Sequence, residues 1–416
     1  MYIFPGYTAY HEKEDVLYVT SKLYRNEVKI TDPDLKKEFY ALVQNKGCTE
    51  LTTALTKFLH EQELLATESE IQYALEEAKA LLGNALLLTI MPTESCNFRC
   101  PYCYETHNSE IMSKEILYRI HDYIKSQAPK FKKLCISWFG GEPTLCKDII
   151  LETSSLVHSL QKQHQFEYNA DMVTNGYLLD KESFIQYYKA GVTSYQITLD
   201  GWNHDKTRPH VTGKGTLKKI VDNLLEISML SEDYHFHIVI RHNVLAGDED
   251  YSWYDYLYKL FGKDKRFSIA IALVTDWGGE TVKELNLAEK EQREQLRKAH
   301  ETYLDKIGMK REHKSKEPFC NICYSSCPYG FVFRPNGKIE KCTIAIDHPN
   351  NQVGYVDSEK GVIINKELSN RWCHSKINPE CYTCDELLSC LNISCRKKII
   401  VDGYSDKLCL CSKENK

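Results

Sequence analysis

The residues best suited to chemistry in this chain are its cysteines, which gather in two regions. The sequence has 17 cysteines in 416 residues. Cys96, Cys100 and Cys103 form the pattern CxxxCxxC, and eleven more lie between residues 320 and 411. Thiolates are ligands for iron-sulfur clusters and zinc, so two metal-binding regions are predicted. The other three cysteines are scattered and are expected to be small buried apolar residues: Cys48, Cys135 and Cys146.

The first motif predicts an open iron-sulfur cluster. Three thiolates in one short loop can hold three irons of a [4Fe-4S] cluster, and the local sequence offers no fourth cysteine. One iron can then bind the amino and carboxyl groups of a substrate, as catalytic metals keep a free position. The alternative is a zinc site or a ferredoxin-type loop, although zinc knuckles usually pair two CxxC units.

The elements that must position this loop are short apolar runs separated by amphipathic helical stretches. Runs typical of buried strands begin at residues 86, 134, 166, 195, 236 and 268. Six such strands alternating with helices favour a parallel sheet in a barrel or part of one. Ligands bind at the carboxyl ends of strands in such sheets, and the CxxxCxxC loop follows the first strand.

Polar or glycine-rich motifs follow the next three strands. The second strand ends at Gly140-Gly141-Glu142-Pro143, and paired glycines let a backbone approach a ligand closely. The third and fourth strands end at Thr174-Asn175-Gly176 and Thr198-Leu199-Asp200-Gly201. Asn-Gly and Asp-Gly also form turns whatever the function, so turn chemistry remains an alternative for these two.

From about residue 86 onward, the sequence resembles the radical S-adenosylmethionine (SAM) superfamily. The family motif CxxxCxφC, with φ aromatic, is matched in full, and Tyr102 is the aromatic residue expected against the adenine. The GGEP segment about 40 residues later and the two strand ends match as well. The resemblance implies an α/β fold with a partial (β/α)6 TIM-like barrel. It also implies these cofactor-binding residues: Tyr102, Gly140, Gly141, Glu142, Pro143, Asn175, Thr198, Asp200 and Arg208.

The chemistry implied by this resemblance is reductive cleavage of SAM. An electron from reduced flavodoxin or ferredoxin would yield a 5′-deoxyadenosyl radical, which abstracts a hydrogen atom from the substrate. Asp276 and Glu280, at the end of the sixth strand, are weak candidates for a catalytic base. Surface polarity explains them equally well.

The C-terminal cysteines resemble the SPASM extension of radical SAM enzymes. Cys327, nine residues, Gly337, four residues and Cys342 follow its first pattern. The second pattern departs slightly, because four residues separate the last two cysteines of Cys381-x2-Cys384-x5-Cys390-x4-Cys395 where the family has three. The alternative is a zinc ribbon built from two CxxC pairs.

By this resemblance two auxiliary [4Fe-4S] clusters raise the total to three. The ligands of one would be Cys327, Cys342 and Cys395, with Cys320 or Cys323. The ligands of the other would be Cys381, Cys384 and Cys390, with Cys409 or Cys411. Cys373 is not expected to be a ligand. The zinc alternative would use Cys320, Cys323, Cys381 and Cys384.

Three domains are expected: residues 1–84, 85–310 and 311–416. In the first, two strand-like runs at 16–31 precede a helix started by Asp32-Pro33, and Thr67 with Glu70 forms a capping box for another helix. This arrangement predicts a winged-helix-like α+β domain. A strongly charged helix at 285–308 closes the barrel domain, and little hydrophobic periodicity follows until residue 397.

The favoured function is maturation of a ribosomally made precursor peptide, with a thioether or carbon-carbon crosslink as product. Members of that group often carry a small N-terminal domain where the leader peptide can add a strand to a sheet edge. Sulfatase maturases are the alternative, but they typically have Asp where this chain has Thr343, and they lack about 85 N-terminal residues. A non-catalytic iron-sulfur carrier or metal-stabilised scaffold is the alternative from another class, and it would need no GGEP segment.

The bulk composition limits the partners. With 42% hydrophobic and 27% charged residues, the chain is an ordinary globular protein. A net charge of -5 gives no basic field for nucleic acid or anionic lipid. The N-terminus lacks a signal peptide and no run of about 18 apolar residues is present. We therefore expect a cytoplasmic protein with no nucleic-acid or membrane partner, whose cysteines bind metal because the compartment is reducing.

Overall fold

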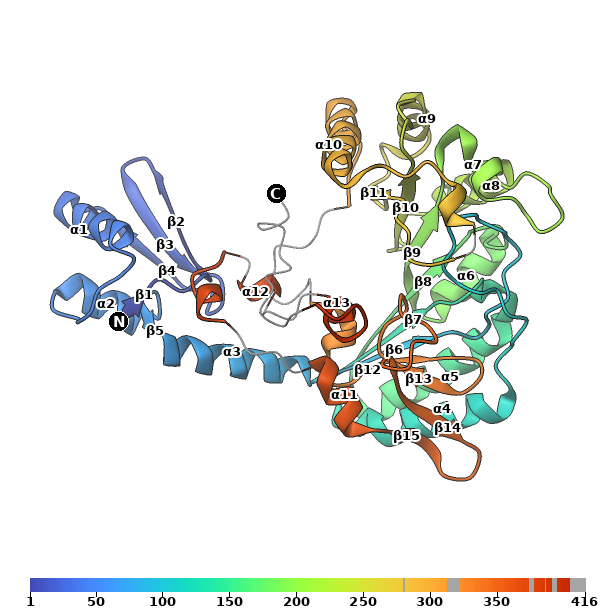
Figure 1. Ribbon diagram of the computed structural model, residues 1–416, viewed down its shortest axis with the longest axis horizontal. Helices are drawn as coiled ribbons and strands as arrows, with labels where there is room; N and C mark the ends of the chain where they lie inside the picture. The colour runs from blue at the N-terminus through green and yellow to red at the C-terminus, as the bar shows by residue number, and fades with distance from the viewer. Residues whose placement is uncertain (280, 313–321, 374–377, 386, 391–394, 405–416) are drawn as a thin grey trace. The chain divides into compact units, whose positions relative to one another are not determined.

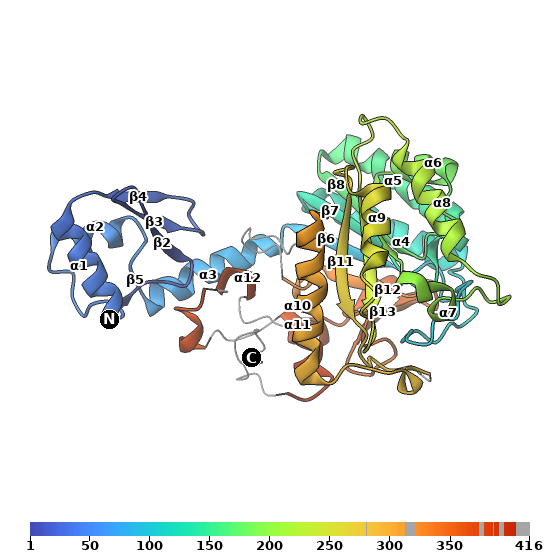
Figure 2. The same cartoon turned by 90° about the horizontal axis from the view of Figure 1, so that it is seen from above.

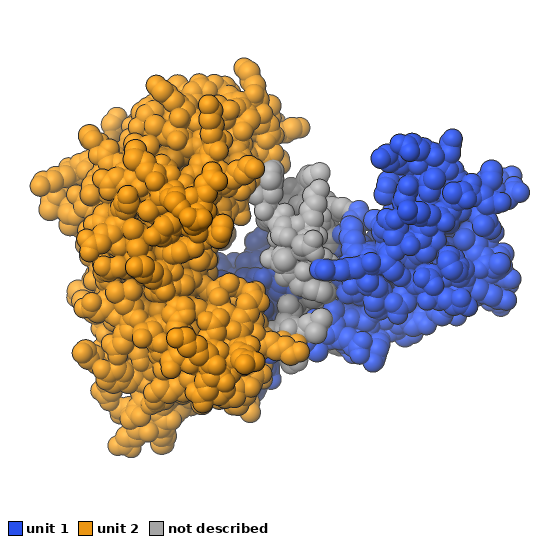
Figure 3. All heavy atoms as spheres, turned by 180° about the vertical axis from the view of Figure 1, so that it is seen from behind, with its two compact units in different colours: residues 1–83, 314–328, 367–416 blue, residues 84–313, 329–366 orange. Residues whose placement is uncertain are grey.

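The computed structural model describes residues 1–279, 281–312, 322–373, 378–385, 387–390 and 395–404. They fall into two compact units, which Figure 3 shows in blue and orange. Unit 1 takes its residues from 1–83, 314–328 and 367–416, and unit 2 from 84–313 and 329–366. The units therefore do not follow the order of the chain, because the N-terminal and C-terminal segments share one of them.

Unit 2 is built on six parallel strands in sequential order. Their bounds are β6 Ala85–Ile90, β7 Lys133–Trp138, β8 Glu167–Thr174, β9 Val192–Thr198, β10 His237–Val244 and β11 Phe267–Leu273. Each strand pairs in parallel with the next, and helices intervene along the chain (Figure 1). All six predicted strands are present, so the partial (β/α)6 TIM-like barrel is confirmed.

The barrel core explains why these segments form strands. Buried and partly exposed residues alternate along β7 and β10, as expected where one face packs under helices and the other lines the interior. Helices α4, α5, α6 and α8 lie together on one side of the sheet (Figure 2). The helices of unit 2 are α4 Lys114–Gln127, α5 Lys147–His164, α6 Lys181–Lys189, α7 His204–Thr207, α8 Leu217–Ser228, α9 Ser252–Phe261 and α10 Lys290–Ile307.

Four further strands extend the barrel sheet beyond β6. β12 (Gly330–Phe333) pairs in parallel with β6, and the next three continue antiparallel in the order β13, β14, β15. Their bounds are β13 Lys338–Glu340, β14 Gln352–Asp357 and β15 Gly361–Ile364. These strands were not predicted, because the region shows little hydrophobic periodicity and each strand is six residues or fewer.

The N-terminal part of unit 1 is a sheet followed by helices, as predicted. The antiparallel order is β2 (Thr8–Lys13), β3 (Val16–Ser21), β4 (Glu27–Ile30). The helices are α1 Pro33–Gln44, α2 Ala54–Glu61 and α3 Glu68–Leu82. A short antiparallel pair joins β1 Tyr2–Ile3 to β5 Ala66–Thr67. The Asp32 cap of α1 and the reciprocal bonds between Thr67 and Glu70 form as expected.

The C-terminal part of unit 1 contains short helices. They are α11 Lys366–Cys373, α12 Leu387–Cys390 and α13 Arg396–Ile400, with 3-10 turns η5 Tyr324–Ser326 and η6 Pro379–Cys381. No disulfide joins any two of the described cysteines. Among the helices that the structure describes, none is long and apolar enough to cross a membrane.

Candidate functional site

The CxxxCxxC loop lies between β6 and α4, at the carboxyl ends of the barrel strands. Its last four residues form a tight turn in which the Cys103 amide donates to the Cys100 carbonyl, 3.0 Å away. The Phe98 amide approaches the Cys96 sulfur at 3.4 Å. The loop also pairs with the fourth barrel crossover, since the Arg99 amide donates to the Pro209 carbonyl at 3.0 Å. The motif is therefore folded by its own backbone and by the segment after β9.

The three thiols need a cation to ionise. Burial raises the pKa of Cys96 to about 12, and the nearby Glu142 carboxylate adds to the effect. Burial and the Glu105 carboxylate raise the pKa of Cys103 to about 12, and burial raises the pKa of Cys100 as well. A bound metal centre stabilises thiolates, so this donor set fits an iron-sulfur cluster chemically. Within the part of the chain that the structure describes, no three His, Cys, Asp or Glu side chains converge as a ready-made metal site.

Gly140 and Gly141 permit close packing of two strand ends. A Cβ at Gly140 would lie 2.4 Å from the Thr93 carbonyl oxygen, and one at Gly141 would lie 2.3 Å from that of Ser95. The Gly141 amide donates to Thr93 at 3.2 Å. The Glu142 amide donates to Ser95 at 2.9 Å. These glycines thus bind the backbone immediately before Cys96, which is a structural reason for the GG pair.

Glu142 fastens the ends of β7 and β8 to each other. It is fully buried, and its carboxylate accepts bonds from the Thr174 hydroxyl at 2.6 Å and the Asn175 amide at 2.7 Å. Thr144 donates to the same carboxylate through both its amide and its hydroxyl. Burial raises the pKa of Glu142 even though four donors favour the carboxylate. Pro143 is buried beside it, at the start of the 3-10 turn η2 (Pro143–Cys146).

Asn175 reaches from the end of β8 to the cysteine loop. Its side-chain nitrogen donates to the Asn97 side-chain oxygen at 2.7 Å and lies 3.9 Å from the Cys96 sulfur. Its side-chain oxygen accepts the Tyr177 amide at 3.0 Å, so the Asn-Gly turn is present as well. The functional and the turn interpretations of this residue are both compatible with the structure.

Tyr102, Asp200 and Arg208 form one buried polar cluster. The Tyr102 hydroxyl donates to the Asp200 carboxylate and accepts from Arg208 at 3.0 Å and from the Asn243 side chain at 3.2 Å. Asp200 also accepts the Thr207 hydroxyl at 3.0 Å. Three residues predicted separately, from a loop, a strand end and a helix end, are therefore brought together.

His204 is hydrogen-bonded to this cluster through the backbone of Asp200. It is completely buried, and its Nδ1 accepts the Asp200 amide at 3.1 Å. Burial lowers the pKa of His204 to about 2, with smaller contributions from Arg208 and His242. The ring is therefore neutral at physiological pH with its proton on Nε2, since Nδ1 accepts.

A cavity of about 170 Å³ opens beside Tyr102 at the carboxyl ends of the strands. Thr198 lines it, as predicted, together with Gln196, Arg241 and Asn243. Arg241 and Asn243 were missed, although they occupy alternate positions of β10 and so point to the same face of the strand. The cavity's remaining lining residues are Cys103, Tyr104, Glu105, Phe139, Val173, Leu273, Val274, Thr275 and Trp277.

A buried ion pair holds the segment between β6 and the cysteine loop. Arg334, which follows β12, donates from Nε to the Glu94 carboxylate at 2.6 Å, and the two side chains are 1% and 3% exposed. Arg334 also binds Glu340 and Asp347, each at 3.2 Å. Neither Glu94 nor Arg334 was predicted, because nothing in the local sequence connects positions 240 residues apart.

The structure gives no support to the candidates for a catalytic base, Asp276 and Glu280. Asp276 is exposed, and its carboxylate accepts the Gly278 amide at 2.9 Å, which is a turn interaction. Glu280 lies outside the described residues.

The C-terminal cysteines are only partly described. Cys323, Cys327, Cys342, Cys381, Cys384 and Cys395 are placed, whereas Cys320, Cys409 and Cys411 and the side chain of Cys390 lie outside the described residues. Cys327 and Cys342 are buried. The Cys342 amide donates to the Asn351 side chain at 2.9 Å, so an intact hydrogen-bonded turn holds this cysteine.

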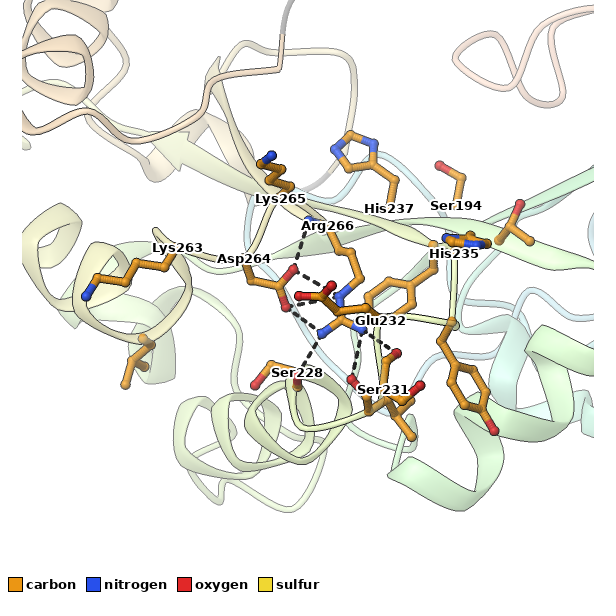
Figure 4. A pocket seen from close by; sticks show the side chains of 15 residues that line it. Ser194, Ser228, Ser231, Glu232, His235, His237, Lys263, Asp264, Lys265 and Arg266 are labelled. Carbon is orange, nitrogen blue, oxygen red and sulfur yellow. Dashed lines mark hydrogen bonds and ion pairs between the residues drawn. The ribbon is translucent and has the colours of Figure 1, made fainter.

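A larger cavity, of about 1100 Å³, lies at the opposite, amino ends of β9, β10 and β11. Figure 4 shows Arg266 at its centre, directed toward Asp264 and the backbone near Ser231. Arg266 pairs with Asp264 at 2.7 Å and donates to the Ser228 carbonyl at 2.8 Å. The Arg266 guanidinium is thus already bonded to Asp264 and to backbone carbonyls. The cavity lies at the opposite end of the barrel from the cysteine loop.

Comparisons with known proteins agree on the barrel. Residues 90–257 match the model of the radical SAM superfamily. A GTP 3',8-cyclase of Aliarcobacter butzleri is 31% identical over 149 residues, which are 34% of this chain and 42% of that protein. A probable GTP 3',8-cyclase of Archaeoglobus fulgidus is 32% identical over 140 residues, 33% of this chain and 43% of that protein. The chain thus spans less than half of these relatives.

Solved structures show the same fold. Native anSMEcpe with bound AdoMet and Kp18Cys peptide has a TM-score of 0.52 at 19% identity, covering 74% of this chain and 88% of its own. Streptococcus suis SuiB bound to precursor peptide SuiA has a TM-score of 0.51 at 13% identity, covering 94% of both chains. At such identities the likeness establishes the fold alone.

Proposed function

Because residues 90–257 form a radical SAM domain, we propose that this chain is a radical SAM enzyme that modifies a ribosomally made precursor peptide. When bound, SAM and a [4Fe-4S] cluster supply the reductive cleavage that yields a hydrogen-abstracting radical. The product is an intramolecular thioether or carbon-carbon crosslink. The supporting observation for a peptide substrate is the fold shared over 94% of the chain with SuiB, which was solved with a precursor peptide.

In this proposal Cys96, Cys100 and Cys103 hold the SAM-binding cluster. Their loop sits at the carboxyl ends of the strands, where α/β barrels bind ligands. The Gly140–Gly141 packing and the Arg334–Glu94 pair fix the backbone before Cys96 and so orient the loop. An electron reaches it from reduced flavodoxin or ferredoxin.

SAM itself is proposed to lie against Tyr102, in the cavity lined by Thr198 and Arg241. Asp200, Arg208 and Asn243 hold the Tyr102 hydroxyl, so the ring is fixed before a ligand arrives. Such prior ordering lowers the entropy cost of binding. The proposed SAM contacts also include the backbone edge of Gly140–Gly141 and the Asn175 side chain, whereas Glu142 and Pro143 act by supporting them.

Two auxiliary [4Fe-4S] clusters are proposed in the C-terminal region. One uses Cys327, Cys342 and Cys395 with Cys320 or Cys323, and the other uses Cys381, Cys384 and Cys390 with Cys409 or Cys411. The described turn at Cys381–Cys384, in which the Cys384 amide donates to the Cys381 carbonyl at 3.0 Å, repeats the turn at Cys100–Cys103. Two CxxC segments with one backbone geometry support a common type of centre.

The N-terminal sheet is proposed to dock the leader of the precursor. β4 is an edge strand, since it pairs with β3 and forms no other strand pair among the described residues. Its Val28 and Ile30 face the core while Glu27 and Lys29 are exposed. An edge with charged outward residues resists aggregation yet leaves backbone groups for an added strand.

A nucleotide substrate is the competing possibility, because the curated relatives are GTP 3',8-cyclases. Those matches cover about a third of the chain and less than half of each relative, so they leave the substrate of this chain open. The N-terminal sheet lies outside residues 90–257, which match the radical SAM family model, and a peptide gives that sheet a use. Incubation with GTP, SAM and dithionite should therefore give no GTP-derived product.

The first experiment tests the radical chemistry. After anaerobic reconstitution, SAM and dithionite should yield 5′-deoxyadenosine, and the C96A/C100A/C103A variant should lose this product together with about four irons. The matched control, C48A/C135A/C146A, should keep its iron and still form 5′-deoxyadenosine. Product formation by the first variant would disprove the cluster assignment.

The second experiment tests the peptide substrate. Small peptides encoded beside this protein are co-expressed with it, and mass spectrometry should find a loss of two hydrogens in one of them. Single prolines across Glu27–Ile30 should weaken binding of that precursor, because each removes a backbone donor, while prolines in the opposite edge strand β2 serve as the control. Full binding by every β4 variant would exclude this edge as the docking site.

A further inference from the structure

The N-terminal residues and the C-terminal cysteine segments of unit 1 share one hydrophobic core. Tyr7, Ile71 and Leu75, all at most 1% exposed, pack in a cluster with Tyr382 and Leu387. Further members of this cluster are Ile3, Ala66 and Leu388. Cys381 and Ile322, the latter within the segment between Cys320 and Cys323, pack against the same cluster. Ile322 and the Cys381–Cys384 segment therefore pack against the N-terminal domain.

The tightest contact in this shared core joins Gly6 to the Cys381–Cys384 turn. The Gly6 amide donates to the Tyr382 carbonyl at 2.6 Å. A Cβ built on Gly6 would lie 1.9 Å from the Cys384 carbonyl oxygen and 2.6 Å from its carbon. These are backbone atoms and cannot rotate away, so any side chain at position 6 must displace the turn.

Short-range hydrogen bonds hold the backbone on both sides of the contact between Gly6 and the Cys381–Cys384 turn. The Cys381–Cys384 turn closes on its own hydrogen bond, and the Leu387 amide donates to the Cys384 carbonyl at 2.9 Å. On the other side, Gly6 lies in a turn in which the Thr8 amide donates to Pro5 at 2.7 Å. Thr8 begins β2, so a displaced turn cannot relax without also moving the sheet.

We propose that Gly6 is a positioning residue for the Cys381–Cys384 turn, so that the N-terminal domain is a structural part of the C-terminal metal centre. The ligand role of the two cysteines rests on the proposed function, but the contact that braces them does not. At Gly6, the domain proposed to dock the precursor is thus in direct backbone contact with the turn proposed to bind iron. Removing residues 1–83 would expose that core, so truncation is a poor test of leader docking.

Gly6→Ala tests the brace through metal content. Reconstituted G6A should lose as much iron and sulfide as the C381A/C384A variant. The combined triple variant should lose no more, because G6A displaces the same two ligands that C381A/C384A removes. Gly83→Ala is the matched control, since among the described residues a Cβ there would meet just the Ala80 carbonyl oxygen, at 3.1 Å, and it should keep parental iron. Additive losses in the triple variant would overturn the proposal.

Thiol alkylation of the metal-free protein tests the brace without any metal. Mass spectrometry should find faster modification of Cys381 and Cys384 in G6A than in the parent. Cys48 is the internal control, because it lies in the same unit and its backbone pairs with Tyr2 at 2.7 and 3.0 Å. Its rate should be unchanged.

The alkylation rates distinguish the brace at Gly6 from the ligand role of Cys381 and Cys384. Unchanged rates at Cys381 and Cys384, or equal acceleration at Cys48, would overturn the brace, because Gly6 would then be neutral or would serve the whole domain. If the rates at Cys381 and Cys384 alone rise but C381A/C384A keeps all its iron, the brace stands and the ligand assignment under the proposed function fails.

Discussion

The hydroxyl of Tyr102, the residue before the last cysteine of the first motif, donates a hydrogen bond to the carboxylate of Asp200, 98 residues away. Arg208 and Asn243 donate to the same hydroxyl. This arrangement makes the aromatic position of the motif a junction between the cysteine loop and the fourth and fifth strands. It also explains why Tyr, and not Phe, occupies that position here.

Removing the Tyr102 hydroxyl should slow SAM cleavage without changing the assembly of the iron-sulfur cluster. Tyr102→Phe removes the acceptor of the buried Arg208 and the half-buried Asn243, and we expect a loss of about 1–3 kcal/mol in unfolding free energy. Iron content should be unchanged, because no cysteine is altered, while SAM cleavage should slow. The control is Tyr118→Phe, whose ring is 46% exposed on α4. Unaltered stability of Y102F by denaturant titration would contradict the junction.

The glycine pair can be tested by contrasting two glycines that both have a positive φ but differ in the space around them. Gly140 and Gly213 have φ of +112° and +76°, but a Cβ meets the Thr93 carbonyl at 2.4 Å only at Gly140, whereas Gly213 has open space. Gly140→Ala should therefore displace the cysteine loop and lower iron retained after reconstitution. Gly213→Ala should lose some stability from its positive φ, but it should keep its iron because the added methyl group meets no neighbour among the described residues. Equal iron in the two variants would show that the close approach is unimportant.

The Arg334 clamp should dominate the stability of the barrel rim. Arg334→Gln leaves Glu94 and Glu340, 3% and 1% exposed, without their cation, and breaking a buried pair typically costs about 3–5 kcal/mol. Lys338→Gln is the matched control, because Lys338 is 39% exposed and bonds Asp347 at 2.7 Å. Its loss should stay within about 1 kcal/mol. Chemical denaturation of the metal-free proteins measures both, and similar losses would refute the ranking.

His204 should make the stability of the barrel depend on pH. Its folded pKa of about 2 is far below the ordinary value of 6.5. Below about pH 6 the unfolded chain therefore binds a proton that the folded chain does not, and stability falls as pH falls, by about 1.4 kcal/mol per pH unit. His204→Gln should reduce this slope between pH 6.5 and pH 4.5 in urea titrations of metal-free protein.

The control for this pH dependence is His235→Gln, which alters an exposed residue just before β10. The parental slope should persist in that variant. A parental slope in H204Q would mean that other groups set the pH dependence.

The sequence by itself determined the barrel and the positions of its motifs. Buried parallel strands read as continuous apolar runs, so β6 to β11 and the loops at their carboxyl ends were predictable. Local chemistry also determined the helix starts, since Asp32 and Thr67 bond to amides within three residues. The CxxxCxxC motif and its aromatic position needed no structure to be located.

Only the tertiary structure decided what each residue at the site touches. Glu142 was predicted beside a ligand, but its carboxylate is taken up by Thr144, Thr174 and Asn175. The pairing of Arg334 with Glu94 joins positions 240 residues apart, and the contact of Gly6 with Cys384 joins the two ends of the chain. Such contacts depend on how distant segments meet in a core, which residue spacing along the chain does not encode. For this reason the sequence identified the chemistry, and the fold identified the residues that hold it in place.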